Sequence, residues 1–413
     1  MERAELARRL GSAPCSAEPH DAVVEERESA RFMAAFAEAV AGSGTVLVAD
    51  PSWSTVERAQ FAALLASQVA SRRSRSDPGW LCLPTGGTSG TLRLARHNQA
   101  TLSAAVRGCC EHFQVRQVNA IGVLPLHHVS GLMAWMRCVL TGGRYLPWRW
   151  EEMEGGHWPE TGTGDWFLSL VATQLQRLLD RPEAPERLRR FRAIFVGGGP
   201  VWPELLDRAA EARLPLAPGY GMTETAAMVT ALRPEEFLAG RRGCGSDLPH
   251  ARIELGADSR IQIAAKSLFR GYYPLSREPG PWQTEDLGRR DEHGSLHVTG
   301  RRDAIIITGG EKVDPSEVEA VLRATGQFAD VAVIGLPDAA WGEALVACYP
   351  AGAPEPDINA VGRHIGSQLA PHKRPKHYLC LGAWPRNDQG KVNRRELAAL
   401  ASAAASRIMR NDA

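Results

Sequence analysis

Through most of the first 250 residues, segments whose apolar positions have helical spacing alternate with segments whose apolar positions are typical of strands. Residues 30–41 repeat apolar positions at helical spacing, and residues 45–49 follow as a short apolar run typical of a buried strand. Because helices that alternate with strands connect parallel strands in one sheet, this pattern predicts an α/β fold with largely parallel sheets. The same reading predicts helices at 101–113, 131–140 and 174–179, and strands at 120–126, 165–171 and 193–196.

The pattern changes after residue 252, where shorter strand-like segments at 260–264 and 296–299 predict a small β-rich subdomain. A new unit begins after Gly300-Arg301-Arg302-Asp303. We therefore expect a large N-terminal domain over 1–302 and a smaller, mobile α+β C-terminal domain over 303–413. In the second domain, strands are expected at 304–308 and 331–334, helices at 315–324 and 359–369, and a fraying helix at 397–406.

The composition narrows the class of protein. A chain of 413 residues exceeds the size at which one core keeps growing, which favours two or more domains. Its 48 Lys and Arg residues against 47 Asp and Glu residues leave a net charge of +1, which gives no field for attracting nucleic acid. Eight cysteines without a Cys-x-x-Cys pair and the lack of a long apolar run predict a cytoplasmic protein without membrane insertion.

A glycine-rich loop carries the first chemical signal. Residues 84–91 read Pro-Thr-Gly-Gly-Thr-Ser-Gly-Thr and follow the apolar run 81–83. Glycines can turn successive backbone N–H groups toward an anion, and the hydroxyl groups can donate beside them, so the loop favours polyphosphate binding. It lacks the Gly-Lys-Ser/Thr of the P-loop, and alone it is more typical of a flexible turn. The candidate phosphate ligands are Thr85, Gly86, Gly87, Thr88, Ser89 and Gly90.

Three later motifs add complementary groups. In Pro218-Gly219-Tyr220-Gly221-Met222-Thr223-Glu224-Thr225, the aromatic ring can stack on a purine, Thr223 can bind phosphate, and the carboxylate of Glu224 suits Mg²⁺. Asp286 can accept the two hydroxyl groups of a ribose. Lys391 stands on a loop next to Gly390. Taken singly, each of these residues is also typical of a turn or of a solvated surface.

In this order, the motifs resemble the acyl/aryl-CoA synthetase superfamily of adenylate-forming enzymes, over residues 81–397. The resemblance implies ATP, Mg²⁺ and coenzyme A as reactants. It implies that Lys391 is the adenylation lysine and that Asp303 is the interdomain hinge. By the same resemblance, the nucleotide is held by the loop Gly198, Gly199 and Pro200, by Tyr220 and Gly221, by Thr223 and Glu224 with the metal, and by Asp286 and Arg301.

The resemblance also implies a two-step reaction. A carboxylic acid attacks the α-phosphate of ATP while positive charge from Mg²⁺ on Glu224 and from Lys391 stabilises the phosphate oxygens. The C-terminal domain then rotates about Asp303 and replaces Lys391 with the loop Thr308, Gly309, Gly310 and Glu311, which admits the CoA thiol. The usual Pro-Lys ending of the phosphate loop is Leu92-Arg93 here, which keeps the positive charge.

Within the superfamily, the chain is most similar to the o-succinylbenzoate:CoA ligases of menaquinone and phylloquinone biosynthesis. This similarity rests on segments 84–90, 125–131, 267–274 and 373–377. Arg137 lies in an otherwise apolar helical run, where an unpaired guanidinium is costly to bury, so it favours an anionic partner. The family implies that this partner is a substrate carboxylate, which Ser130 can help to bind; outward exposure or an internal ion pair remains the alternative for Arg137. The resemblance places the catalytic residue His128 beside the carboxylate that is adenylated and Gly198 in the substrate-binding loop, and His127 is interpreted as a core residue.

Other functions remain open from the residues alone. The nucleotide motifs fit a CoA ligase for another aryl or medium-chain acid, or an enzyme that loads a carrier protein. A nucleotide-binding scaffold without catalysis is a third hypothesis, which the presence of Glu224, Asp286 and Lys391 disfavours. The expected partners are a small carboxylic acid, ATP and CoA, with a possible homodimer.

Overall fold

The computed structural model describes residues 2–13, 21–67, 79–85, 91–199, 201–338, 341–352, 354–386 and 392–411. The chain forms two compact units. The first consists of Met1–Thr284 with Arg289–Val298, and the second of Glu285–Gly288 with Thr299–Ala413. Among the described residues, no helix combines the length and the hydropathy that a membrane crossing requires.

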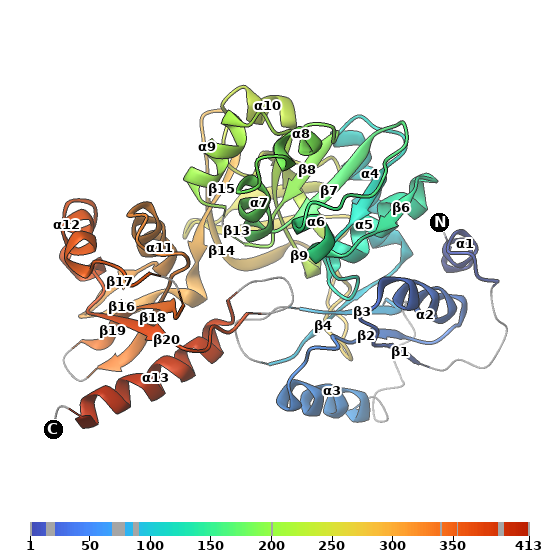
Figure 1. Cartoon of the computed structure of the whole chain (residues 1–413). Coiled ribbons are helices and arrows are strands. Elements are labelled where there is room, and N and C mark those ends of the chain that lie inside the picture. The colour runs from blue at the N-terminus through green and yellow to red at the C-terminus, as the bar shows by residue number, and fades with distance from the viewer. Residues whose placement is uncertain are drawn as a thin grey trace. The chain divides into compact units, whose positions relative to one another are not determined.

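A seven-stranded sheet forms the centre of the first unit (Figure 1). Its strand order is β11-β10-β9-β8-β7-β5-β6. The five strands from β9 to β6 run parallel, β10 pairs antiparallel with β9, and β11 pairs antiparallel with β10. The parallel strands are near-continuous apolar runs because helices cover both faces of the sheet. The strands are β5(Asn119–Gly122), β6(Tyr145–Pro147), β7(Trp166–Leu170), β8(Ala193–Val196), β9(Leu216–Met222), β10(Ala227–Ala231) and β11(Ser246–Asp247).

A smaller sheet of order β1-β2-β3-β4 lies in the same unit, and two helices join it to the first. α4(Gln99–His112) and α5(Val129–Thr141) contribute Leu102 and Met133 to a core with the small sheet, and Cys109 and Cys138 to a core with the large sheet. These two helices are therefore apolar on more than one side. The strands are β1(Ala22–Val24), β2(Val46–Val48), β3(Leu81–Pro84) and β4(Leu94–His97), of which only β4 pairs antiparallel.

The remaining helices of the first unit cover the outer faces. α7(Ala172–Leu179), α8(Ala184–Leu188) and α9(Pro203–Glu211) pack on the large sheet away from α4 and α5, together with Met153 of α6(Trp150–Glu154) and Phe237 of α10(Pro234–Leu238). α1(Arg3–Arg9) and α2(Ser29–Ala41) pack with the small sheet, and α3(Thr55–Ser67) places Phe61 on the opposite side of that sheet.

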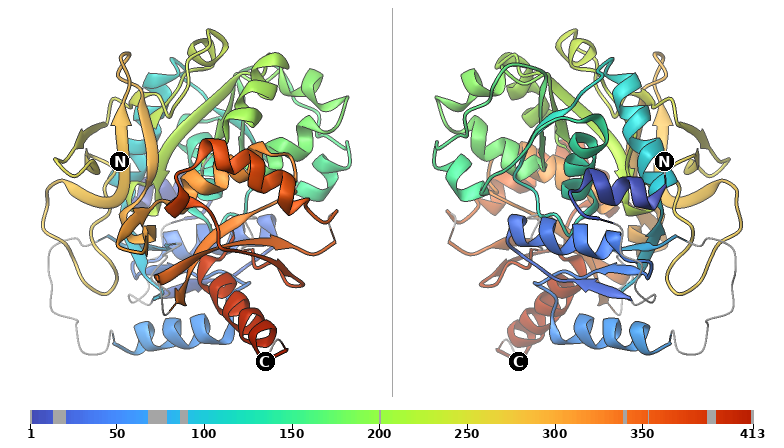
Figure 2. Two further views of the ribbon diagram at one scale, coloured as in Figure 1. Left: turned by 90° about the vertical axis from the view of Figure 1, so that its left-hand side faces the viewer. Right: turned by 90° about the vertical axis from the view of Figure 1, so that its right-hand side faces the viewer.

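A third sheet has the order β12-β13-β14-β15, with strands β12(Ala251–Leu255), β13(Arg260–Ala265), β14(Trp282–Arg290) and β15(Leu296–Arg301). In the second unit, helices cover both faces of a five-stranded sheet (Figure 2). α11(Pro315–Ala324) and α12(Ile358–Gln368) lie on one face, and α13(Arg394–Asn411) lies on the other. The strands are β16(Ile306–Thr308), β17(Glu311–Val313), β18(Ala332–Asp338), β19(Gly342–Pro350) and β20(His377–Leu381).

The predicted fold class is confirmed: the structure has parallel α/β sheets, a small β sheet and a smaller C-terminal α+β unit. The strands predicted at 120–126 and 304–308 were too long, and β16 begins only at Ile306. Residues 120–126 were expected to be extended throughout, but β5 ends at Gly122. Val123, Leu124 and Leu126 remain apolar because the loop that follows β5 is itself buried, and burial alone does not distinguish a loop from a strand.

Candidate active site

Several predicted site residues of the first unit follow strands at their carboxyl ends. The loop ending in His128 follows β5, Gly198 and Gly199 follow β8, and Thr223 and Glu224 follow β9. Carboxyl ends of neighbouring parallel strands meet at one edge, where ligands of open α/β sheets bind. The hydroxyl of Thr223 also lies 3.4 Å from the carbonyl oxygen of Pro84, the last residue of β3, so the two sheets meet at this edge.

Glu224 has a fixed carboxylate. The hydroxyl of Tyr272 donates a hydrogen bond of 2.6 Å to Glu224 Oε1. Burial and the neighbouring Glu224 carboxylate raise the pKa of Tyr272, so its hydroxyl stays a donor at neutral pH. The guanidinium of Arg93 lies 5.3 Å from the centre of the Tyr272 ring, and the N–H of Thr85 donates to the carbonyl of Arg93 at 3.0 Å.

These contacts place a hard oxygen ligand and a cation beside the two ends of the glycine-rich loop. Mg²⁺ prefers carboxylate oxygen together with phosphate oxygen, and an arginine can fork onto phosphate. The donor set formed by Glu224 and Arg93 therefore fits a magnesium-bound polyphosphate. The replacement of the superfamily's lysine by Arg93 keeps a cation at this place.

His97 holds the backbone of the Thr223 turn. Its Nε2 lies 2.8 Å from the carbonyl oxygen of Thr223, and its Nδ1 lies 3.1 Å from the hydroxyl of Thr101. Because a carbonyl can only accept, Nε2 carries a proton and donates it to this bond. Burial lowers the pKa of His97 to about 4, so the ring is neutral and keeps this donor arrangement through neutral pH.

Because of this buried imidazole and a second one, that of His250, we expect the folded chain to lose stability as the pH falls. Burial lowers the pKa of both to about 4, whereas the unfolded value is 6.5. As pH falls below 6.5, the unfolded chain binds protons that the folded chain does not bind, so folding stability falls until about pH 4. Between pH 7 and 5, each ring lowers the free energy of unfolding by roughly 2 kcal/mol.

Urea unfolding at pH 7, 6 and 5 measures this loss. The His250→Gln variant removes one of the rings whose pKa is lowered by burial and should show a visibly shallower loss than the wild-type chain. The exposed residue His364 provides the control, since His364→Gln should leave the slope unchanged. An identical slope in the wild-type chain and in His250→Gln would contradict the assignment.

Tyr220 and Gly221 lie in β9, before the Thr223 turn. Tyr220 is 8% exposed and packs in an apolar cluster with Val229 and Ile263. A Cβ atom on Gly221 would lie 2.0 Å from the carbonyl oxygen of Ala227 in β10, so only glycine permits this approach of the two strands. The structure thus gives both residues a packing role beside their predicted nucleotide contact.

His127 and His128 share one carboxylate, Asp50. Nε2 of His127 lies 3.4 Å from Asp50 Oδ1, and Nε2 of His128 lies 3.8 Å from Oδ2. Burial would raise the pKa of Asp50, but hydrogen bonds from Ser52 and the two imidazoles lower it overall, so the carboxylate is ionised. His127 is 1% exposed, whereas His128 is partly exposed and begins α5. The three side chains also offer ligand atoms within 4.8 Å of one another.

Arg137 is the buried cation of α5. The residue is 5% exposed, and its guanidinium carbon lies 5.0 Å from the centre of the Phe195 ring. Its charge also acts on Cys109, whose thiol pKa is raised by burial and partly lowered again by Arg137. No carboxylate in the described part of the chain lies within ion-pair distance of this guanidinium. Because the residue is buried, the alternative of outward exposure is wrong for Arg137. Ser130 lies two turns earlier on α5.

Asp286, Arg301 and Asp303 form one cluster in the second unit. Arg301 donates to both oxygens of Asp303 at 2.8 and 2.7 Å, and to Asp286 Oδ1 at 2.8 Å. The hydrogen bonds to Asp303 and the charge of Asp286 raise the pKa of Arg301, although burial opposes them. The predicted ribose contacts and the predicted hinge residue are thus directly bonded to one another.

The predicted loop Thr308, Gly309, Gly310 and Glu311 is a tight hairpin. Thr308 of β16 pairs with Glu311 of β17, which leaves the two glycines as the turn. Their φ angles are 58° and 84°, and a two-residue turn with both angles positive favours glycine strongly. Thr308 is buried, whereas Glu311 is exposed.

Several predicted residues lie outside the described residues, and two others are exposed. Gly198 and Gly199 are exposed after β8. The residues outside the described ranges are Gly86, Gly87, Thr88, Ser89, Gly90, Pro200 and Lys391.

The sequence analysis missed Asp50, His97 and Tyr272 as members of the site. Asp50 follows β2 closely, at the carboxyl end of a parallel strand, which is a signal that the sequence did offer. Tyr272 lies in a segment that carried the family resemblance, but without a role. His97 had no local signal, because its partner Thr223 is 126 residues away.

Comparison with known proteins agrees with this geometry. Residues 12–273 match the AMP-binding enzyme family, and residues 317–391 match the AMP-binding enzyme C-terminal domain. The chain is 31% identical over 388 residues to a probable 2-succinylbenzoate–CoA ligase of Mycobacterium tuberculosis (strain H37Rv), with 89% of this chain and 94% of that protein covered. It is also 31% identical over 287 residues to the 2-succinylbenzoate–CoA ligase of Oceanobacillus iheyensis, with 66% of this chain and only 60% of that protein covered.

Solved structures show the same fold. The o-succinylbenzoate CoA synthetase (MenE) of Bacillus subtilis in complex with the acyl-adenylate intermediate OSB-AMP matches with a TM-score of 0.77 at 22% identity, covering 96% of this chain and 91% of that one. The same enzyme in complex with ATP and magnesium ion matches with a TM-score of 0.75 at 22% identity, covering 95% and 92%. With the family match spanning more than half of its residues, the chain belongs to the AMP-binding enzyme family.

Proposed function

We propose that this chain is an AMP-forming acid–thiol ligase that converts 2-succinylbenzoate, ATP and CoA into 2-succinylbenzoyl-CoA, AMP and pyrophosphate. Relatives with this name support the substrate, and the Bacillus subtilis structures support ATP with magnesium and the acyl-adenylate as its bound species. The product belongs to menaquinone biosynthesis, in keeping with the MenE name of the structural neighbours.

The observation that best supports 2-succinylbenzoate as the substrate is the buried cation of α5. Arg137 is 5% exposed and has no carboxylate partner among the described residues. A buried guanidinium without a partner is costly, and a substrate carboxylate offsets that cost when it binds. 2-Succinylbenzoate has two carboxylates, so one can pair with Arg137 while the other reacts.

In the first step, the reacting carboxylate attacks the α-phosphorus of ATP, and pyrophosphate leaves. His128 stands at the N-terminal cap of α5, and its Nε2 lies 3.8 Å from the Asp50 carboxylate, within ion-pair distance but beyond hydrogen-bond distance. Arg93 and Lys391 place positive charge beside the phosphates, and Glu224 is the ligand of magnesium, which supplies further positive charge when it is bound. In the second step, the CoA thiol releases its proton to solvent, its sulfur attacks the acyl carbon, and the bond between that carbon and the phosphate oxygen breaks so that AMP leaves.

The domain organisation, CoA binding and assembly are part of the same proposal. Asp303 acts as the hinge between domains 1–302 and 303–413, and rotation exchanges Lys391 for the hairpin turn Gly309-Gly310. The ion pair of Arg301 with Asp303 supports a defined geometry at the hinge. We further propose that the enzyme is cytoplasmic and assembles as a homodimer.

Removing the hydroxyl of Tyr272 tests the Glu224 site. Tyr272→Phe should raise the KM for MgATP by about 10-fold, because partners that orient a metal-binding carboxylate typically contribute 10- to 100-fold to affinity or activity. The thermal midpoint should change little, and Tyr349→Phe in the second unit is the matched control. An unchanged KM for MgATP in Tyr272→Phe would remove Glu224 from the metal site.

Exchange of labelled pyrophosphate into ATP tests the proposed function without CoA. Exchange that depends on 2-succinylbenzoate, and that exceeds exchange with benzoate or octanoate, is expected. Exchange with another acid alone would replace the substrate and keep the mechanism. A chain that adenylates an acid but transfers it only to a carrier protein would support the carrier-loading alternative, and no exchange with any acid would support the scaffold.

A further inference from the structure

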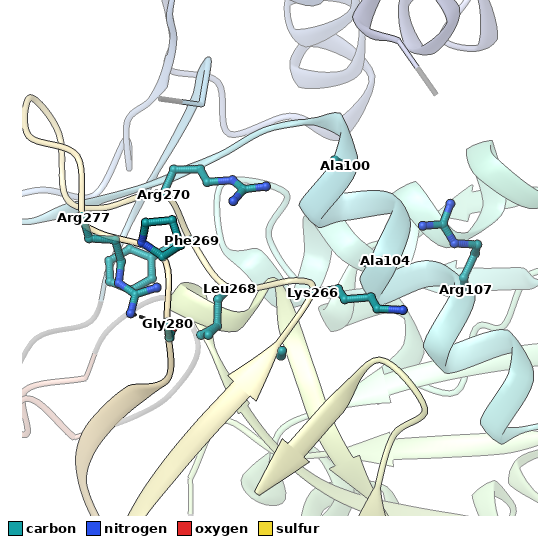
Figure 3. Close-up of a pocket in the computed structure, with 11 residues that line it drawn as sticks. Ala100, Ala104, Arg107, Lys266, Leu268, Phe269, Arg270, Arg277 and Gly280 are labelled. Atoms are coloured by element: carbon teal, nitrogen blue, oxygen red, sulfur yellow. Dashed lines mark hydrogen bonds between the residues drawn. The ribbon is translucent and has the colours of Figure 1, made fainter. Parts of the chain in front are cut away.

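A basic cavity in the first unit lies outside the residues assigned above. It has a volume of about 410 Å³, within the range of small-molecule sites. Its walls come from α4 and from the segment that follows β13 (Figure 3). The lining residues are Ala100, Ala104, Arg107, Ala265, Lys266, Leu268, Phe269, Arg270, Arg277, Pro279 and Gly280.

Four of the lining side chains are cations, and no lining residue is acidic. None of the four forms an ion pair with a carboxylate in the described ranges of the chain. Nε of Arg270 is buried and has no hydrogen-bond partner among those residues. A guanidinium N–H left in this state is costly, so the cavity is arranged for an anion that accepts from it.

The positive charges of the cavity also lower the pKa of neighbouring groups. Burial, followed by the charge of Arg270, lowers the pKa of Arg277. Burial, followed by the charge of Lys266, lowers the pKa of His250 to about 4. Like charges held together in this way repel one another, and an anion with more than one negative charge relieves that repulsion.

One wall of the cavity is apolar. Ala100 and Ala104 lie one turn apart on α4, and their small side chains leave space above the helix. Arg277 lies over the ring of Phe269, 5.4 Å from its centre, and donates to the carbonyl oxygens of Gly280 and Pro281. Figure 3 shows Arg277 beside Phe269, with Lys266 extending toward α4, which carries Arg107. A cationic rim over apolar and flat surfaces suits a phosphate group joined to an apolar or aromatic body.

We propose that this cavity binds a phosphate-bearing anion. Two sources share this chemistry: the phosphorylated nucleotide end of CoA, an assignment that rests on the proposed function, and a free phosphate compound such as pyrophosphate. The cavity shares no lining residue with the predicted adenylate site, although the N–H of Phe269 donates to the carbonyl of Glu224 at 2.8 Å. This hydrogen bond ties the cavity wall to the turn that carries Glu224.

The test is calorimetric titration of the full chain and of the double variant Arg107→Ala/Lys266→Ala. Both residues are exposed and lie outside the buried apolar clusters, so the variant should fold, which its thermal midpoint checks. CoA, dephospho-CoA and inorganic pyrophosphate are the probes, with AMP at saturating concentration to fill the adenylate site. Arg116→Ala, another exposed cation of the same unit, is the matched control.

The double variant should lose roughly 10- to 100-fold in affinity for at least one probe, and Arg116→Ala should lose nothing. A loss for CoA that exceeds the loss for dephospho-CoA assigns the cavity to the phosphorylated end of CoA. A loss for pyrophosphate alone assigns it to a free phosphate compound. Unchanged affinity for all three probes would overturn the proposal, whether or not pyrophosphate exchange has established the proposed function.

Discussion

Lys391→Ala should lower the rate of acyl-adenylate formation by about 100- to 1,000-fold, the usual effect of removing one charge that stabilises a transition state. Conversion of supplied 2-succinylbenzoyl-adenylate to the thioester should remain largely intact, because in the proposed mechanism the hairpin turn Gly309-Gly310 replaces the lysine in the second step. Single-turnover measurements of the two half-reactions separate these effects.

The control for Lys391 is Arg363→Ala, which removes an exposed cation from α12 of the same unit. Neither half-reaction should change in that variant. Equal loss of both half-reactions in Lys391→Ala would contradict a role confined to adenylation and would indicate damage to the C-terminal unit.

Arg137→Met should lower kcat/KM for 2-succinylbenzoate by about 100-fold, because charge-assisted hydrogen bonds to a carboxylate typically contribute about 1.5–3 kcal/mol each. Activity with a monocarboxylic acid, where it can be detected, should change far less. The free energy of unfolding should stay the same or rise, because methionine replaces a buried charge that has no carboxylate partner among the described residues.

Opposite directions for activity and stability distinguish this variant from simple core damage. Met136→Leu alters the neighbouring, fully buried position of α5 at similar volume and should preserve both properties. A parallel loss of stability and of activity with every acid in Arg137→Met would mean that the guanidinium serves packing against Phe195 and not substrate recognition.

Local patterns predicted the fold well where burial and periodicity agree. The helix at 315–324 begins at Pro315 and ends at Ala324, with Asp314 capping its first turn. The strand at 193–196 was equally well defined because it is buried throughout. The pattern failed at 120–126, where an apolar loop continues a buried strand and periodicity carries no information about hydrogen bonding.

The candidate site was predictable in its motifs but not in its contacts. Glu224 and Thr223 were recognisable from the residues around them, and the structure places Thr223 beside the end of β3. Their partners Tyr272 and His97 come from distant segments, and only the fold brings them together. Asp50 is a similar case, because its two histidines lie more than 70 residues further along the chain.

The most direct measurement of the central claim is the full reaction, with purified chain, MgATP, CoA and 2-succinylbenzoate, followed by mass spectrometry of AMP and acyl-CoA. Rapid formation of 2-succinylbenzoyl-CoA with equimolar AMP, and little thioester from benzoate or octanoate, is the expected result. AMP and thioester formed only from a control acid would contradict the substrate, and the absence of AMP with every acid would contradict catalysis by this chain.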